Sequence, residues 1–480
     1  MKYRSILFRL MNADTVRPLW NFSVIALLWL PLQIKSSGIV NAQRIDNPFS
    51  EITDADNSLP VYQRGGFFEN GFFYHVVKEG DNLLAIAKIY IYFTDEYTVE
   101  SLIERISAIN SLRRYLIYKN QKLIIPVVRT DYNKIPRVIY RRSPGYKAAG
   151  IYLSALTAGS LRGQKLIRRF ADAGGSTIVF DVKDVTGEIF CPVNIPLARR
   201  IGALTNTVIR DVSKLISYIK VHNLHAAARI SIFADTMLAG NMSNYTLRDA
   251  EKNPVCTDGK VLWTDPSHPE VQEYNLEVIR EVCSFGVDEI QLDYIRFPSV
   301  YGKIDMYAGP DQRRDKIITA FVKKVYNLTV TRGIHLTLDV FGITIWGQEI
   351  DILTTGQRLE ELCLYSHAIN PMIYPSHFDP GFAGLENPAD NPERIIFMSM
   401  NRLQEIIRKA GAGTVIRPWL QAFPYKITDF GPEYIIKSVK SAESAGRAGY
   451  MLWSAENRYE TVFTAYDMMK IEKESVISNE

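Results

Sequence analysis

The sequence predicts an α/β protein in which a (β/α)8 barrel, also called a TIM barrel, follows a small α+β module. Three observations support the barrel. From residue 149 onward, short apolar strand patterns alternate with amphipathic helical patterns. Eight strand candidates occur in that part of the chain, which is the strand number of such a barrel. Several helical patterns end at a glycine, the residue that most often terminates helices.

The strand candidates share an enrichment in β-branched and aromatic residues. They lie at residues 150–156, 176–184, 225–235, 287–295, 334–342, 367–375, 414–423 and 449–457. An open, doubly wound sheet is the alternative, but it usually carries a glycine-rich phosphate-binding turn after its first strand, and no such turn follows residue 156. We therefore expect a barrel at residues 149–470, with a tail at residues 471–480.

The N-terminus has the layout of a signal peptide at residues 1–42. Basic residues from Lys2 to Arg17 precede an apolar tract at residues 19–32, and small residues follow as far as Ala42. The tract is shorter than the ~20 residues that span a bilayer, so we expect cleavage after Ala42 and no stable membrane span afterwards. An uncleaved anchor is the alternative. The layout predicts an exported protein that is periplasmic, associated with the cell envelope or extracellular.

Charge and cysteine content narrow the function classes. The 56 basic and 52 acidic residues are dispersed and give a net charge of +4, which does not indicate a nucleic-acid-binding face. The four cysteines are too few and too scattered for a disulfide scaffold or a metal motif, although Cys191 and Cys256 could pair in an oxidising compartment. We expect no cofactor and no metal, and the oligomeric state stays open.

Two polar segments, residues 43–72 and 129–148, are predicted linkers around a small module at residues 73–128. The module opens with "HVVKEGDNLLAIA", a strand and turn followed by a helix that Asp81 or Asn82 caps. A turn at Asn110 and a final strand in "QKLIIP" complete a β-α-α-β order. This order resembles the LysM module. The resemblance implies binding to a glycan that contains N-acetylglucosamine, such as peptidoglycan or chitin. A module that serves only as a spacer is the alternative.

The central strands carry an unusual number of carboxylates. Alternate residues of a strand face opposite sides, so Glu289, Gln291 and Asp293 should face the barrel interior while Ile290 and Leu292 face the helices. By the same alternation, Asp339 should face the interior from the next strand.

The two preceding strands add further charged residues to the interior. Alternation places Arg229 inward on the third strand, and Asp181 and Lys183 inward on the second. Buried charges need partners. We therefore expect Arg229 and Lys183 to neutralise Asp181, Glu289 and Asp293. Because Asp181, Asp293 and Asp339 end their strands, where barrel enzymes hold their reacting groups, they are candidates for catalysis.

Aromatic and amide residues gather at the same end of the strands. Stacking rings beside hydrogen-bonding groups suit sugars, and Trp263 and Trp453 are the strongest stacking candidates. The candidate substrate-binding residues are Asp181, Lys183, Arg229, Trp263, Tyr294, Arg296, Tyr374, Gln421, Trp453, Glu456 and Asn457. Other chemistries are not supported, because the chain has neither a G-x-S-x-G serine motif nor an H-E-x-x-H zinc motif.

Five segments carry a more specific resemblance: "GIYLSALTAG", "VFDVKDVTGEI", "LWTDPSHPEV", "DEIQLDYIRFP" and "LDVFG". Over residues 149 to 460 they resemble a bacterial family of predicted barrel glycoside hydrolases, distantly similar to α-amylase-like barrels. The resemblance implies a nucleophilic aspartate ending strand four, here Asp293, and a carboxylic acid ending strand five, here Asp339. The amylase-like acid is a glutamate, so this chain departs from that pattern. Ile295 stands where chitinases with D-x-x-D-x-D-x-E carry their acid, which argues against that class.

The sequence therefore predicts an exported glycoside hydrolase that cleaves a polysaccharide with two carboxyl groups. Asp293 would act as nucleophile or base and Asp339 as acid, with Glu456 as the next candidate for the acid. The alternative is a non-catalytic cell-wall or glycan-binding protein whose barrel is a receptor. The sugar, the linkage, endo or exo action and the stereochemical outcome stay open.

Overall fold

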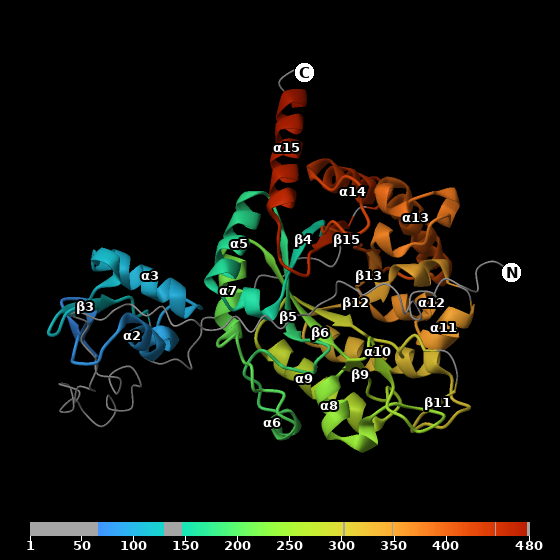
Figure 1. Ribbon diagram of the computed structural model, residues 1–480, viewed down its shortest axis with the longest axis horizontal. Helices are drawn as coiled ribbons and strands as arrows, with labels where there is room; N and C mark the ends of the chain where they lie inside the picture. Colours follow the sequence, from blue (N-terminus) through green and yellow to red (C-terminus); the bar gives the residue numbers. More distant parts are fainter. Residues whose placement is uncertain (1–65, 129–145, 301–302, 348, 447, 478–480) are drawn as a thin grey trace. The chain divides into compact units, whose positions relative to one another are not determined.

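The computed structural model describes residues 66–128, 146–300, 303–347, 349–446 and 448–477. The predicted signal peptide, most of both predicted linkers and the last three residues lie outside this part of the chain. The described residues form two compact units (Figure 1). One is a small N-terminal unit, and the other is a large unit that contains every strand from residue 148 onward.

The small unit is a three-stranded antiparallel sheet with two helices. Its sheet has the order β1 (Gly66–Glu69), β2 (Phe72–Val76), β3 (Lys122–Ile125), and the helices α2 (Leu83–Tyr90) and α3 (Val99–Ile109) lie between β2 and β3 in sequence. From β2 onward this is the predicted β-α-α-β order. Asn82 caps α2, because its side chain accepts a hydrogen bond from the Ala85 amide at 2.8 Å.

Strand β1 corrects the predicted linker boundary at residue 72. Asn70 and Gly71 have φ values of 51° and 82°, so they form the two-residue turn that joins β1 to β2 as a hairpin. Aromatic residues on both sides of this Asn-Gly pair supply the strands. The small unit therefore begins before the predicted start at residue 73.

The large unit is a closed barrel of eight parallel strands, as predicted (Figure 1). Every neighbouring pair is parallel, and the ring closes because the last strand pairs with the first and the fifth pairs with the sixth. The strands are β4 (Ala148–Leu153), β5 (Thr177–Lys183), β6 (His225–Ser231), β10 (Glu289–Asp293), β12 (His335–Phe341), β13 (Ala368–Ile373), β14 (Val415–Ile416) with β15 (Trp419–Gln421), and β16 (Gly449–Trp453).

The seventh strand has two segments because Arg417 and Pro418 interrupt it. Proline has no backbone N–H to donate to the neighbouring strand, so the ladder breaks at this point. Both β14 and β15 pair with β13, which keeps the barrel closed.

Helices surround the ring of strands (Figure 1). The helix α13 begins at a proline and ends before Gly411, whose φ of 67° stops it. The final helix α15 runs to Ile477 and therefore includes most of the segment predicted as a tail from residue 471. The longer helices are α5 (Leu161–Asp172), α7 (Val212–Val221), α9 (Pro269–Ser284), α10 (Arg314–Val330), α13 (Pro392–Ala410), α14 (Pro432–Ala445) and α15 (Glu460–Ile477).

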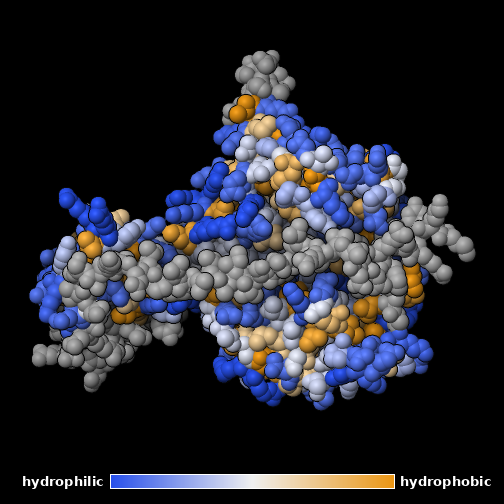
Figure 2. All heavy atoms as spheres, in the orientation of Figure 1, coloured by the Kyte–Doolittle hydropathy of each residue, from blue (hydrophilic) through white to orange (hydrophobic). Residues whose placement is uncertain are grey.

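Two apolar layers stabilise the barrel. Outward-facing strand residues such as Ile290 and Leu292 pack against the helices in the main hydrophobic core. A smaller cluster inside the ring includes Tyr152, Trp419 and Met451. On the face of the large unit that Figure 2 shows, hydrophobic residues occur in small groups among hydrophilic ones, as expected when apolar helix stripes face the strands.

Two further features bear on the predicted setting. Within the described part of the chain, no helix combines the length and apolar character needed to cross a membrane. The suggested pairing of Cys191 with Cys256 does not occur in the structure, where all four cysteines are free. Cys191 is buried in the core while Cys256 is exposed.

The closure between β16 and β4 yields a test of the fold. Gly449 starts β16 with a φ of 85°, and a Cβ atom there would lie 1.8 Å from the Ala148 carbonyl oxygen. We expect Gly449→Ala to lower the free energy of unfolding by at least ~1–3 kcal/mol, measured by urea unfolding. Gly413→Ala is the matched control, because a Cβ at that glycine meets no atom within 4 Å. Equal stability of the two variants would contradict this account of the closure.

Candidate active site

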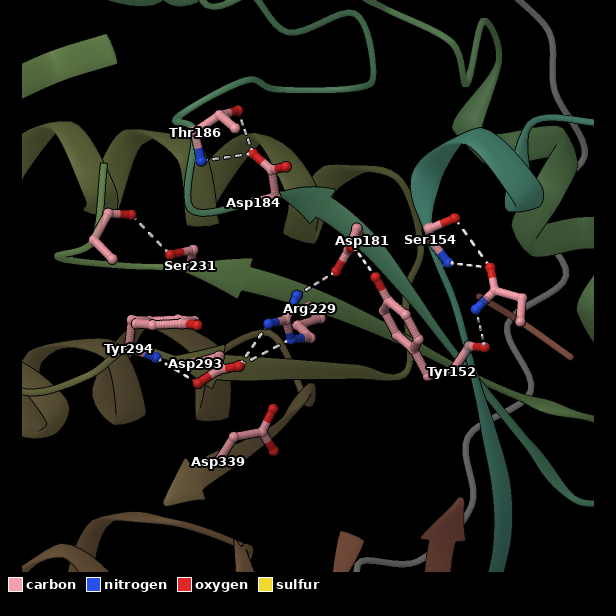
Figure 3. Close-up of polar contacts among 12 residues, drawn as sticks. Tyr152, Ser154, Asp181, Asp184, Thr186, Arg229, Ser231, Asp293, Tyr294 and Asp339 are labelled. Carbon is pink, nitrogen blue, oxygen red and sulfur yellow. Dashed lines mark hydrogen bonds and ion pairs between the residues drawn. The ribbon is translucent and has the colours of Figure 1, made fainter. Parts of the chain in front are cut away.

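Three buried aspartates meet at the C-terminal ends of neighbouring barrel strands. Asp181 lies in β5, Asp293 ends β10 and Asp339 lies in β12, and they are 4%, 6% and 2% exposed. Arg229 in β6 lies between the first two (Figure 3). The registers pair Asp181 with Arg229, and Arg229 with Gln291. The inward direction predicted for these three aspartates and Arg229 is therefore the one the structure shows.

The guanidinium of Arg229 binds two of the carboxylates at once. Its Nη1 donates to Asp181 Oδ1 at 2.6 Å, and its Nε and Nη2 donate to Asp293 Oδ2 at 3.1 and 2.6 Å (Figure 3). Burial lowers the pKa of Arg229, but the two aspartates outweigh it and raise the pKa above its usual range. Arg229 is therefore a permanent cation that stabilises negative charge on both partners.

Asp181 is held on its other side by a phenol. Tyr152 donates its hydroxyl hydrogen to Asp181 Oδ2 at 2.5 Å (Figure 3). Burial raises the pKa of Asp181, while Arg229 and Tyr152 oppose that effect. Both oxygens of Asp181 are occupied, so this residue mainly fixes the position of Arg229.

Asp293 receives a further hydrogen bond from the residue that follows it. The Tyr294 amide donates to Asp293 Oδ1 at 2.6 Å. The backbone of Tyr294 is left-handed, with a φ of 50°. A non-glycine residue in that region costs about 1–3 kcal/mol and is often found at functional sites.

Asp339 has a different environment from Asp293. Its Oδ1 accepts hydrogen bonds from Asn370 Nδ2 and Trp419 Nε1, both at 3.0 Å. No described residue donates to its Oδ2. Burial and the negative charge of Asp293 raise the pKa of Asp339 to about 8, although Arg229 and the two donors oppose the shift. Asp339 therefore keeps a proton at neutral pH.

Lys183 does not join this group, which corrects the predicted network. The register shifts between Asp181 and Lys183, and Lys183 pairs with Ile230 across the ladder. Because of this irregularity, the Lys183 side chain does not point in the direction that strict alternation from Asp181 predicts. Its ammonium forms a buried ion pair with Asp235 at 2.7 Å and a hydrogen bond to Asn275 of α9 at 3.1 Å.

Glu289 also lies apart from Arg229, contrary to the prediction. It pairs with Arg417 at 2.8 Å and with His225 at 3.1 Å, near the N-terminal ends of the strands. Glu289, His225 and His335 offer ligand atoms within 4.8 Å of one another. The adjacent guanidinium of Arg417 repels a metal cation, so this cluster does not fit a metal site.

The predicted sugar-binding residues divide into two groups. Trp453 is partly exposed and stacks on Tyr152 with ring centroids 4.0 Å apart, and Arg229 lies over its ring at 5.2 Å. Tyr374 is buried, and burial together with the charges of Asp339 and Asp293 raises its pKa. Trp453, Tyr374 and Tyr294 therefore lie beside the three aspartates and Arg229.

Four other predicted contacts, Trp263, Gln421, Glu456 and Asn457, have structural roles or lie at the surface. Trp263 is fully buried, and its indole donates to Thr257 Oγ1, so the ring cannot stack on a sugar in this structure. Gln421 hydrogen-bonds to loop backbone at Ser376, Phe423 and Tyr425. Asn457 joins Ser154 to the Tyr152 carbonyl, and Glu456 is exposed and paired with Arg458.

Three residues near the carboxylates are absent from the predicted set. Tyr152 and Asn370 face inward from β4 and β13, and the alternation of those strands could have found them. Asp184 follows β5 and accepts hydrogen bonds from the Thr186 amide and hydroxyl (Figure 3). Burial raises the pKa of Asp184 to about 6, and the charge of Asp181 adds to this effect.

Comparison with known proteins gives one family and several solved structures. No curated protein matches the chain. A hypothetical protein from Ruminiclostridium thermocellum is 27% identical, with a TM-score of 0.36 over 40% of this chain and 97% of that one. The PgaB (BpsB) glycoside hydrolase domain from Bordetella bronchiseptica is 12% identical, with a TM-score of 0.48 over 64% and 94%. A GH36 alpha-galactosidase from Geobacillus stearothermophilus is 14% identical, with a TM-score of 0.42 over 68% and 41%.

The family match covers the barrel. Residues 150–459 match the family described as "Putative glycosyl hydrolase domain". This range is more than half of the chain, and it includes Asp181, Arg229, Asp293 and Asp339. The chain belongs to this family, and its barrel is a glycoside hydrolase domain with a carbohydrate as substrate.

Proposed function

We propose that the protein is an exported glycoside hydrolase that cleaves a polysaccharide with Asp293 and Asp339. The supporting observation is the contrast between these two carboxyl groups. Asp293 accepts hydrogen bonds from a cation, whereas Asp339 is buried among neutral donors and has a pKa of about 8. Cleavage of a glycosidic bond needs one charged and one protonated carboxyl group, and this pair supplies both.

Asp339 would be the general acid. Asn370 and Trp419 both donate to its Oδ1, which leaves Oδ2 to carry the proton. From Oδ2 the proton would pass to the glycosidic oxygen as the bond breaks. This transfer stabilises the leaving group, which would otherwise depart as an alkoxide.

Asp293 would act on the other side of the bond. As a carboxylate it would attack the anomeric carbon, or would remove a proton from an attacking water. Arg229 positions it and stabilises its charge, and Asp181 with Tyr152 fixes Arg229. The Trp453 ring is partly exposed beside these carboxylates, so its exposed part would contact the sugar.

The N-terminal unit would hold the enzyme on a glycan that contains N-acetylglucosamine, such as peptidoglycan or chitin. Its β-α-α-β order supports a LysM module. Asn110 holds the turn after α3 against strand β3 through two hydrogen bonds to the backbone of Ile124. The basic and apolar layout of residues 1–42 supports export to the compartment in which such glycans occur.

Replacement of Asp293 tests the proposed nucleophile or base. Asp293→Asn keeps the shape of the side chain but removes its charge, so we expect the rate on a cleavable glycan to fall by at least ~10²–10⁴-fold. Asp311→Asn, at an exposed aspartate, should keep full activity. Released reducing ends measure the rate, and circular dichroism checks the fold. Full activity of Asp293→Asn on a confirmed substrate would remove this residue from the mechanism.

The raised pKa of Asp339 predicts the alkaline limb of the pH profile. Because the proton is bound below about pH 8 and lost above it, activity should fall as the pH rises through 8. Asp339→Ala should abolish that limb. It should also slow natural glycans far more than nitrophenyl glycosides, whose leaving group needs no proton. An equal loss on both substrate types, with the limb retained, would assign the acid to another residue.

Deletion of residues 43–130 tests the N-terminal unit. We expect the shortened protein to lose most of its sedimentation with insoluble peptidoglycan or chitin, because the tether raises the local concentration of the barrel at the polymer. Hydrolysis of a short soluble substrate should change by less than about twofold, since Asp181, Arg229, Asp293 and Asp339 all lie in the large unit. Equal sedimentation of the intact and shortened proteins would show that the unit is only a spacer.

A further inference from the structure

Arg296 is a buried cation without a carboxylate partner among the described residues. Arg296 comes three residues after the end of strand β10, and it is 6% exposed. Its Nη1 donates to the Phe297 carbonyl at 3.0 Å and to Ser299 Oγ at 3.4 Å. In the described part of the chain, its Nε and Nη2 have no hydrogen-bond acceptor. The other buried guanidinium groups differ, because Arg229 and Arg417 both form ion pairs with carboxylates.

Aromatic rings surround this guanidinium. Its central carbon lies 4.1 Å from the ring centroid of Phe341, 4.9 Å from that of Trp263 and 5.6 Å from that of Tyr294. Such contacts offset part of the cost of burying a cation, but they supply no acceptor for its N–H groups. Burial lowers the pKa of Arg296 to about 10, so the group still carries its charge at neutral pH.

Arg296 and the three rings around it, here called the cage, lie beside the proposed catalytic carboxylates. Arg296 is three residues beyond Asp293, and the charge of Asp293 acts on its pKa. Asp293 forms no ion pair with Arg296; its oxygens accept hydrogen bonds from Arg229 and from the Tyr294 amide. Tyr294 and Phe341 are only partly buried, so solvent and substrate can reach the edge of the cage. The N–H groups of Arg296 that have no acceptor suit an anionic group of the substrate.

We propose that the Nε and Nη2 edge of Arg296 binds a carboxylate carried by the sugar, so that the enzyme acts on an acidic glycan. This inference rests on the proposed glycosidase function. A carboxylate is planar and forms two parallel hydrogen bonds with such an edge. It also carries a single charge, which limits its repulsion from Asp293. Two sources share this chemistry: a uronic acid, and the lactyl ether of muramic acid in peptidoglycan.

Binding measurements with two acidic glycans test the inference. The probes are an oligosaccharide of alternating glucuronic acid and N-acetylglucosamine, and peptide-free glycan strands of peptidoglycan. Each probe is compared with its carboxyl-reduced form by calorimetry, in the Asp339→Ala background to limit turnover. The N-terminal unit would contribute equally to the acidic and reduced forms, because both keep N-acetylglucosamine.

We expect one acidic probe to bind about 10- to 100-fold more tightly than its reduced form, and the identity of that probe tells which source is used. Arg296→Gln should remove the preference. Arg296→Lys, which keeps the charge but not the fork, should retain only part of it. Arg280→Gln is the matched control at an exposed arginine paired with Glu273 and should keep the full preference. Thermal unfolding checks that each variant is folded.

Three results would overturn the inference: equal affinity for acidic and reduced forms, no binding of either acidic probe, or a preference that survives Arg296→Gln. These outcomes are separate from failure of the glycosidase proposal. If the acid preference is absent while Asp293→Asn still abolishes hydrolysis of a neutral glycan, only the carboxylate site falls. If the preference is present but Asp293→Asn leaves hydrolysis unchanged, the proposed catalytic pair falls instead.

Discussion

The arrangement of the active site depends on the buried ion pairs between Arg229 and two aspartates. One guanidinium holds Asp181 and Asp293 at 2.6 Å each, deep in the end of the barrel. Buried charges are costly unless they are paired, so the cation and the two carboxylates offset that cost for one another. Because one positive charge faces two negative ones, the group keeps a surplus of negative charge. That surplus, together with burial, makes a second charged carboxylate at Asp339 unfavourable.

The separation of charges elsewhere in the barrel keeps this group distinct. Lys183 is paired with Asp235 on the far side of a strand irregularity, and Glu289 is paired with Arg417 and His225 at the other end of the strands. Lys183 and Arg417 each have an acidic partner other than Asp339, and neither is bonded to the carboxylates around Arg229. Arg296 differs from them because rings, and not carboxylates, surround it.

Asp293 and Asp339 have identical side chains but different hydrogen-bond donors. Charged donors stabilise the carboxylate form of Asp293, whereas Asp339 is bound by an amide and an indole, which stabilise a negative charge less strongly. Trp419 and Tyr374 of the inner cluster lie close to Asp339, which is 2% exposed. Two residues of one type thus have different electrostatic environments in the same glycoside hydrolase domain.

The sequence by itself determined the properties that depend on local alternation. The eight strands and the inward direction of Asp181, Arg229, Asp293 and Asp339 follow from a period of two residues along each strand. The same reasoning could have included Tyr152 and Asn370, whose strands show the same alternation. The first hairpin was also within reach, because Asn70-Gly71 between aromatic runs is a strong local turn signal.

Only the tertiary structure decided which charges meet. Lys183 lies outside the carboxylate cluster around Arg229, because the strand register shifts after Asp181. That shift depends on the neighbouring strand. Trp263 is fully buried in the main core, and Glu289 pairs with Arg417, which is distant in sequence. Alternation fixes the side of a strand on which a residue lies. The partner of that residue depends on the register between strands, the course of the loops and the competition among buried charges. All three are set by contacts between residues distant in sequence, so the sequence pattern alone does not give them.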